Sequence, residues 1–138
     1  MNEATLYHLF RENLVILEFG NQTALRPFNL TVHQFDALCL LSEQEGIRMG
    51  ELKDKLLSDN SKITRTVDFL EKRGLAKRVP DPKDRRAQTV IITDAGMDLR
   101  DKVTAVHQTY LKQKFSTLSE NEKEQLQTLL TKLRVAHE

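Results

Sequence analysis

A chain of 138 residues, 39% hydrophobic and 30% charged, has the composition of a globular protein and the length of one domain with helical extensions. Its single cysteine excludes an internal disulfide, and its apolar run near the start, Leu14 to Leu17, is far too short for a signal peptide or a membrane span. We therefore expect a soluble protein of the reducing cytoplasm, with no membrane partner.

The net charge of +1 is spread unevenly along the chain. Residues 1–47 carry two basic and six acidic side chains, residues 48–86 carry twelve and seven, and residues 87–138 carry seven of each. A positive middle third is expected where phosphates must be neutralised. Composition alone favours the plainer interpretation, a basic but merely solvated helix surface.

The first predicted helix covers Ala4 to about Leu25 and ends before Pro27. Its apolar residues recur at helical spacing and cover much of its circumference: Leu6, Leu9, Phe10, Leu14, Ile16, Leu17 and Phe19. A helix of this kind must be buried on more than one side, and a partner subunit is a plausible source of that burial.

The second predicted helix begins at Thr31, because Thr31-Val32-His33-Gln34 is a capping box. Its inward-facing residues are expected to be Val32, Phe35, Leu38, Cys39 and Leu41, and Gly46 is expected to close it. A short third helix follows, with Met49, Leu52 and Leu56 at turn spacing.

The fourth predicted helix, Asp59 to Arg73, has two distinct faces, and Gly74 suits its C-terminal end. The apolar face carries Ile63, Val67 and Leu70, and the opposite face carries Ser61, Arg65, Asp68 and Lys72. An apolar stripe that docks the helix, opposite a face of hydrogen-bonding groups, is what a major-groove recognition helix needs.

A hairpin follows, with predicted strands Leu75 to Val79 and Gln88 to Ile92 around a basic loop. Arg85 and Arg86 at its tip can reach a phosphate or a narrow minor groove. We expect Asp84 to pair with the Arg86 guanidinium and to fix its direction.

Thr93 caps a long fifth helix, and the capping box that begins at Ser119 opens a final one. The predicted fold class is therefore mainly α with a small β-hairpin wing (α+β), a winged helix-turn-helix flanked by terminal helices. We expect residues 1–30 and 94–138 to mediate dimerisation and residues 31–93 to bind DNA.

From Leu30 to Gly96 the chain resembles the MarR family of bacterial transcriptional regulators. The resemblance rests on the segment from Ile63 to Leu75, on Asp81-Pro82-Lys83-Asp84-Arg85-Arg86, and on Val90 to Gly96. It implies a homodimer whose first and last helices interlock, and whose two lobes read a pseudo-palindrome in double-stranded DNA. It also implies a ligand or oxidant that changes the spacing of the lobes, often a small anionic or aromatic effector.

The candidate DNA-binding residues lie on the fourth helix and at the wing tip: Asn60, Ser61, Lys62, Thr64, Arg65, Lys83, Asp84, Arg85 and Arg86. The helical residues are assigned to base and phosphate contacts and Arg86 to a minor-groove or phosphate contact, while Asp84 orients an arginine. The alternative for each is solvated surface.

Other candidate sites are weaker. Cys39 is interpreted as a core residue and not an oxidant sensor. The histidines His8, His33, His107 and His137 lack zinc-ligand spacing, so neither a metal nor another cofactor is expected. Tyr7, Arg11 and His33 could line an effector site, but none is assigned and the ligand-binding residues stay open.

No catalytic constellation is present in the sequence, so an enzyme is disfavoured. The rival to a DNA-binding repressor is a winged-helix module for protein association, with an incidental basic face. Salt-dependent binding to duplex DNA separates the two.

Overall fold

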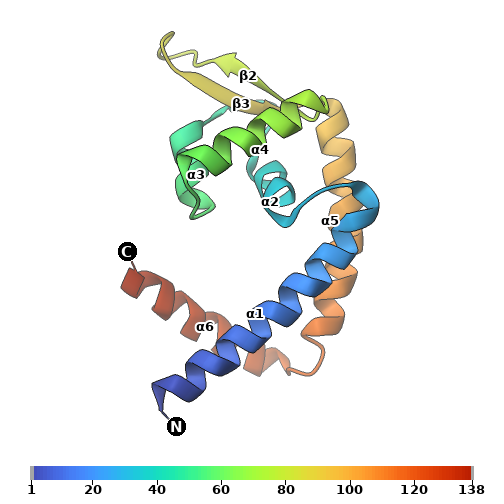
Figure 1. Ribbon diagram of the computed structural model, residues 1–138, viewed down its shortest axis with the longest axis vertical. Helices are drawn as coiled ribbons and strands as arrows, with labels where there is room; N and C mark the ends of the chain where they lie inside the picture. Colours follow the sequence, from blue (N-terminus) through green and yellow to red (C-terminus); the bar gives the residue numbers. More distant parts are fainter. Residues whose placement is uncertain (1, 138) are drawn as a thin grey trace.

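A computed structural model describes residues 2–137, and of His137 only the backbone; Met1 and Glu138, the outermost residues of the predicted terminal segments, lie outside the described residues. The predicted fold class is confirmed: helices dominate, with a small antiparallel sheet (Figure 1). The elements in chain order are α1 (Glu3–Leu25), the 3-10 helix η1 (Arg26–Phe28), α2 (Val32–Leu40), β1 (Ile47–Arg48), α3 (Met49–Lys55), α4 (Asn60–Lys72), β2 (Ala76–Pro80), β3 (Gln88–Ile92), α5 (Asp94–Lys114) and α6 (Glu120–His137).

Helix α1 runs without a break through Gly20 and packs along α5. A Cβ at position 20 would overlap the ring of Tyr110 on α5, whose hydroxyl donates to the Leu17 carbonyl oxygen at 3.3 Å. Glycine is therefore needed at this point for the close approach of the two helices.

Helix α2 begins with the predicted capping box: the Thr31 hydroxyl accepts from the Gln34 amide at 3.2 Å, and the Gln34 side chain accepts from the Thr31 amide at 3.0 Å. The predicted end at Gly46 is wrong, because α2 stops at Leu40. The carbonyl oxygen of Ser42 instead accepts from the Ile92 amide at 3.0 Å, which brings the chain alongside β3.

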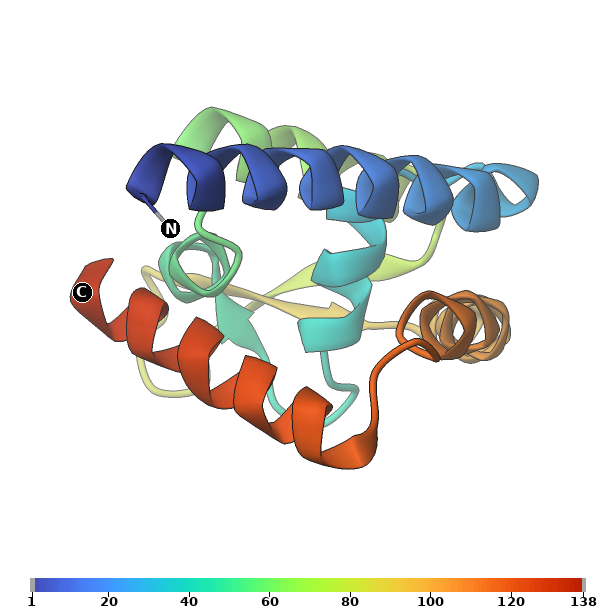
Figure 2. The same ribbon diagram turned by 90° about the horizontal axis from the view of Figure 1, so that it is seen from below.

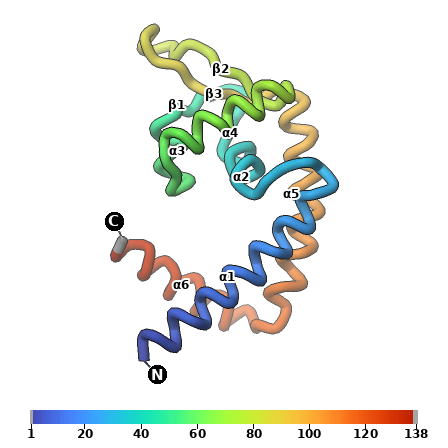
Figure 3. The backbone as a smooth tube through the Cα atoms, in the orientation of Figure 1, coloured from blue at the N-terminus to red at the C-terminus, as the bar shows by residue number. Residues whose placement is uncertain are grey.

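This change of direction creates β1, a strand that the sequence interpretation missed. The sheet order is β1-β3-β2, antiparallel throughout, with Ile47 opposite Val90 and Ala76 opposite Ile92 (Figure 3). Strand β2 starts one residue later than predicted, at Ala76. Leu75 follows the C-terminal end of α4 and is bonded to it, because its amide donates to the Leu70 carbonyl oxygen at 2.9 Å.

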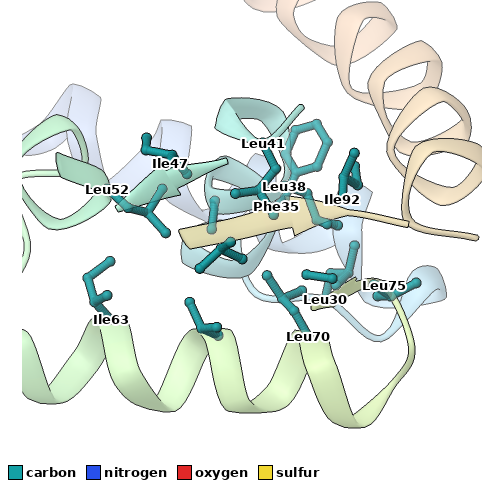
Figure 4. Packing of buried hydrophobic residues seen from close by; sticks show 14 of the residues in the cluster. Leu30, Phe35, Leu38, Leu41, Ile47, Leu52, Ile63, Leu70, Leu75 and Ile92 are labelled. Atoms are coloured by element: carbon teal, nitrogen blue, oxygen red, sulfur yellow. The ribbon is translucent and has the colours of Figure 1, made fainter. Parts of the chain in front are cut away.

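The core lies where α2, α3 and α4 cover the sheet, with Leu25 of α1 and Val103 of α5 added from outside the winged lobe (residues 31–93). Figure 4 shows Ile63 and Leu70 pointing from α4 toward Leu38 of α2. Each fully buried side chain of this size contributes about 1.5–3 kcal/mol relative to exposure.

Cys39 is a correction to the prediction, because it lies exposed on α2. The next residue along a helix is rotated by about 100°, so Cys39 turns away from the core that Leu38 fills. Partial burial raises the pKa of the Cys39 thiol, and the nearby Asp36 carboxylate raises it further. Both effects disfavour the reactive thiolate.

The junction of α4, the hairpin and α5 is closed by backbone hydrogen bonds. Gly74 adopts a φ of 72°, and its amide donates to the Glu71 carbonyl oxygen at 3.0 Å, which completes a Schellman motif with the Leu75 bond. The Thr93 hydroxyl donates to the Gly74 carbonyl oxygen at 2.6 Å and accepts from the Gly96 amide at 3.1 Å. A Cβ on Gly96 would collide with the backbone of Leu75, so this position requires glycine.

Helix α6 and the N-terminal part of α1 extend away from the lobe. Figure 2, seen from below, shows α1 and α6 as separate rods, and Figure 1 shows α6 and the N-terminal part of α1 at the end of the molecule opposite the wing. The predicted capping box opens α6: the Glu122 amide donates to the Ser119 hydroxyl at 3.1 Å, and the Ser119 amide to the Glu122 side chain at 2.9 Å. Within residues 2–137, no helix combines the length and hydropathy needed to cross a bilayer.

Candidate nucleic-acid interface

Helix α4 has the two faces that its sequence predicts. Ile63, Val67 and Leu70 are buried, whereas the predicted DNA-contacting residues on this helix are all exposed: Asn60, Ser61, Lys62, Thr64 and Arg65. The side chain of Asp59 caps the helix by accepting from the Lys62 amide at 2.8 Å. The first two turns of α4 therefore present polar and cationic groups to solvent.

The cations on this face are not neutralised by the chain itself. Lys62 and Arg65 form no ion pair with any residue between positions 2 and 137. The Thr64 hydroxyl donates to the Asn60 carbonyl oxygen at 2.8 Å, which leaves its lone pairs free to accept. Exposed guanidinium and ammonium groups of this kind can bind phosphate oxygens or base edges.

A partly buried polar contact anchors the N-terminal half of α4, and the sequence interpretation missed it. Thr66 is only 6% exposed, and its hydroxyl lies 2.8 Å from Nδ1 of His33 on α2. Nε2 of the same imidazole lies 3.1 Å from the hydroxyl of Ser58, in the linker before α4. Partial burial lowers the pKa of His33, the charge of Lys62 lowers it further, and Asp59 opposes the shift.

The wing tip exposes three further predicted cations, Lys83, Arg85 and Arg86, none of which is ion-paired within the part of the chain that the structure describes. The prediction for Asp84 is wrong in its detail. The Asp84 carboxylate accepts from the backbone amide of Arg86 at 3.0 Å, and forms no ion pair with that guanidinium. An aspartate that satisfies its own turn is common in tight loops, and it leaves the Arg86 side chain free.

The base of the wing is held by a long-range ion pair. Arg48 of β1 bonds the Asp81 carboxylate through Nε at 2.8 Å and Nη2 at 2.7 Å, while the Lys83 amide donates to the other carboxylate oxygen at 2.9 Å. The Lys83 bond and then Arg48 lower the pKa of Asp81. The short strand β1 thereby fixes the direction in which the hairpin leaves the sheet.

A second arginine joins the hairpin to α4. Arg78 of β2 contacts Asp68 through Nη2 and Glu71 through Nη1, both at 2.6 Å. The sequence offers no signal for this cluster beyond the presence of the three residues. In Figure 1, the N-terminal end of α4 and the wing tip lie on the same side of the lobe.

The remaining predicted candidates are dispersed. Tyr7 and Arg11 lie on the exposed N-terminal half of α1, whereas His33 is engaged with Thr66 and Ser58 inside the lobe. His107 of α5 lies 2.8 Å from Asn21 of α1. Among the described side chains, no three histidine, cysteine, aspartate or glutamate residues gather as a metal site.

An amphipathic α4 that follows the short α3, a hairpin with a basic tip, and a three-stranded antiparallel sheet define a winged helix-turn-helix protein. Residues 30–87 match the family model described as "MarR family". PapX of Escherichia coli, an HTH-type transcriptional regulator, is 35% identical over 109 residues, which are 79% of this chain and 66% of PapX. YkoM of Bacillus subtilis, an uncharacterised HTH-type transcriptional regulator, is 34% identical over 105 residues, 76% of this chain and 67% of YkoM.

Two solved structures extend the likeness over nearly the whole chain. A cysteine-to-serine variant of E. coli MarR in complex with operator DNA has a TM-score of 0.85 at 27% identity, covering 94% of this chain and 93% of that one. CouR from Rhodococcus jostii RHA1, bound to p-coumaroyl-CoA, has a TM-score of 0.86 at 29% identity, covering 93% and 90%. The chain belongs to the MarR family of winged helix-turn-helix transcriptional regulators. It spans about two thirds of the length of the curated relatives it matches.

Proposed function

We propose that this chain is a sequence-specific regulator of transcription that binds double-stranded DNA as a homodimer and acts as a ligand-responsive repressor, not as an enzyme. The observation that carries the proposal is the exposed cationic surface shared by the first turns of α4 and the wing tip. Within residues 2–137 its lysines and arginines have no acidic partner. A duplex supplies the phosphates that would neutralise them. The structural likeness to E. coli MarR, which was solved in complex with operator DNA, supports the proposal of DNA binding.

Each element of the surface has its own role in this proposal. Asn60, Ser61, Lys62, Thr64 and Arg65 enter the major groove, with Arg65 reading a base edge. Arg86 contacts the minor groove or a phosphate beside it, and Lys83 and Arg85 add phosphate contacts. Asp84 holds the loop that presents them.

Dimerisation is assigned to residues 1–30 and 94–138, and DNA binding to residues 31–93. Most large apolar side chains on α1 are between 45% and 70% exposed, and Leu129, Leu130 and Leu133 of α6 are between 40% and 60% exposed. A groove of about 700 Å³ between α5 and α6, lined in part by Leu111, Phe115 and Leu126, offers a place for apolar side chains of a second copy. Two lobes related by a two-fold axis would reach major grooves about 10 bp apart or a multiple of that, which matches a pseudo-palindrome.

A small anionic or aromatic effector is the proposed regulatory ligand. The support is CouR, whose structure holds p-coumaroyl-CoA, an anionic molecule with an aromatic ring. No residue of this chain is assigned to the effector.

The deciding experiment measures binding to duplex DNA against salt. Duplexes selected from a random library by the protein are labelled, and affinity is followed by fluorescence anisotropy between about 50 and 200 mM salt. We expect a steep linear fall of log affinity with log salt, because phosphate contacts release counterions. Absence of binding to any duplex at low salt would leave a protein-association module and refute the proposal.

The variant Arg65→Ala tests base reading by α4. We expect it to weaken binding to the selected duplex by about 1–3 kcal/mol and to relax the preference at one base pair. The same assay on random duplex supplies the comparison. Equal losses on both duplexes would reassign Arg65 to a phosphate contact.

The variant Arg86→Ala tests the wing. We expect weaker binding to all duplexes and a shallower salt slope, by about one charge, with folding and dimerisation intact. Lys132→Ala, which removes a cation from α6 at the opposite end of the molecule, is the matched control. If the two variants bind alike, the wing has no part in the complex.

A further inference from the structure

Arg78 makes three hydrogen bonds to α4 from the middle of the wing strand β2. Its guanidinium spans two carboxylates, those of Asp68 and Glu71, at 2.6 Å each. Its backbone amide donates to the second oxygen of Glu71 at 2.9 Å. Both carboxylates and the strand are thus joined by one side chain that is itself only 20% exposed.

The carboxylates would otherwise oppose DNA binding. Asp68 follows Arg65 by three residues, so it continues the exposed stripe of α4 one turn further along the proposed DNA face. Its side chain is 59% exposed, and that of Glu71 is 39% exposed. Unpaired negative charges here would face the phosphate backbone, and like charges brought together across an interface weaken binding.

The same bonds set the angle between helix and wing. The Schellman motif at Gly74 reverses the chain, so β2 runs back along α4 toward the wing tip. A turn alone leaves the far ends of both elements free to swing. Arg78 ties them four residues beyond the reversal, and a guanidinium bonded to two acceptors is held more firmly than one in an isolated exposed pair.

We infer that Arg78 is a positioning residue for DNA binding: it neutralises Asp68 and Glu71 and locks α4 to the wing, so that both enter the duplex at one fixed spacing. The inference rests on the proposed function. It assigns to Arg78 a role in discriminating the operator from other duplexes, without contact to DNA.

A mutant cycle tests it. Arg78→Gln is compared with wild type, and both are repeated in an Asp68→Asn, Glu71→Gln background, with binding to selected and random duplexes measured at a temperature where all four are folded. In the native background we expect Arg78→Gln to lose about tenfold or more in affinity for the selected duplex, and to lose less on random duplex. With both carboxylates replaced by amides, most of the loss should disappear.

Lys77→Gln is the matched control, because it removes the same charge from the neighbouring position of β2, where the side chain is exposed. If Lys77→Gln and Arg78→Gln lose equal affinity for the selected duplex, the loss comes from net charge alone and the inference is overturned. The same Arg78→Gln loss in both backgrounds would also overturn it, since the carboxylates would then be irrelevant. If wild type binds no duplex, the proposed function itself fails.

A structural defect is separated from positioning by a second variant. Arg78→Lys keeps the positive charge, but a compact ammonium group cannot bridge two carboxylates in the way that the planar guanidinium does. We expect it to keep random-duplex affinity while the ratio of selected to random affinity falls about tenfold. A ratio equal to that of wild type would contradict the positioning role. Circular dichroism and gel filtration verify that each variant is folded.

Discussion

Several leucines of the winged lobe are fully buried, whereas several leucines of α1 and α6 lie largely open to solvent. Leu38, Leu52 and Leu70 of α2, α3 and α4 are 0% exposed. They belong to one core, to which the sheet also contributes buried residues. Leu14 of α1 and Leu133 of α6 are 51% and 60% exposed. Side chains of the same type therefore have opposite environments in one chain.

The difference shows which part of the molecule buries its apolar side chains within this chain. The lobe buries its core within this chain, and Leu25 of α1 and Val103 of α5 complete that core. An exposed apolar surface as extended as that of α1 and α6 marks an interaction site. Dimerisation through α1 and α6, as proposed above, would bury these side chains.

The largest effect is expected from opening the closed core. Leu70→Ala removes a fully buried side chain from α4 and should lower the free energy of unfolding by about 3–5 kcal/mol, since a cavity adds to the lost burial. Urea unfolding measures the change. Lys72→Ala, exposed two residues further along the same helix, is the control and should stay within about 0.5 kcal/mol of wild type. A loss for Leu70→Ala as small as that of the control would show that the lobe is not closed.

An intermediate effect is expected from charging the open surface. Phe19 is 70% exposed on α1, and Phe19→Glu should weaken dimerisation by about 2 kcal/mol or more while the lobe stays folded. Sedimentation equilibrium measures the dimer, and circular dichroism the fold. Asn13→Glu places the same charge at a polar position of α1 and should leave the dimer intact. If the Phe19→Glu protein dimerises like wild type, the dimer interface does not include this part of α1.

The smallest effect concerns pH and tests how tightly α4 is anchored inside the lobe. The pKa of His33 lies below its usual value of 6.5 in the folded state, so between the two values the unfolded chain binds more protons. Stability attributable to neutral His33 is therefore full above about pH 6.5 and is lost as pH falls through that value toward the lowered pKa.

Unfolding measured from pH 8 to pH 5.5 should show this loss in wild type and a shallower one in His33→Gln, which hydrogen-bonds without titrating in this range. His8→Gln, at an exposed position of α1, is the matched histidine-to-glutamine control. If His33→Gln follows the wild-type curve throughout, protonation of His33 does not couple to folding.

Local features of the fold were predictable from sequence because short-range chemistry determines them. The capping boxes at Thr31 and Ser119 and the αL residue Gly74 depend only on neighbours within a few positions, and each is found as expected. The apolar stripe of α4 was equally clear, since helical periodicity marks a buried face. The same reasoning found the exposed cations of the candidate site, though their contacts with DNA stay a prediction.

Features that depend on distant residues were missed or misjudged. Strand β1 is two residues long, which is too short for an alternating pattern, and it forms only because it pairs with β3. That pairing also draws the chain out of α2 well before Gly46. The Asp84 carboxylate accepts a hydrogen bond from a backbone amide two residues away, while the Asp81 carboxylate pairs with Arg48. Charge partners separated by more than thirty residues leave no periodic signal.

Backbone hydrogen bonds within the loop hold the wing tip, so its exposed side chains can be exchanged. The Asp81 amide donates to the Ala87 carbonyl oxygen, and the Ala87 amide to that of Asp84, both at 3.0 Å. The loop backbone thus holds its shape without help from Lys83, Arg85 or Arg86, whose side chains point to solvent. Those three positions can therefore be varied together, as a small library, to test the proposed role of the wing in DNA binding while the loop backbone stays unchanged.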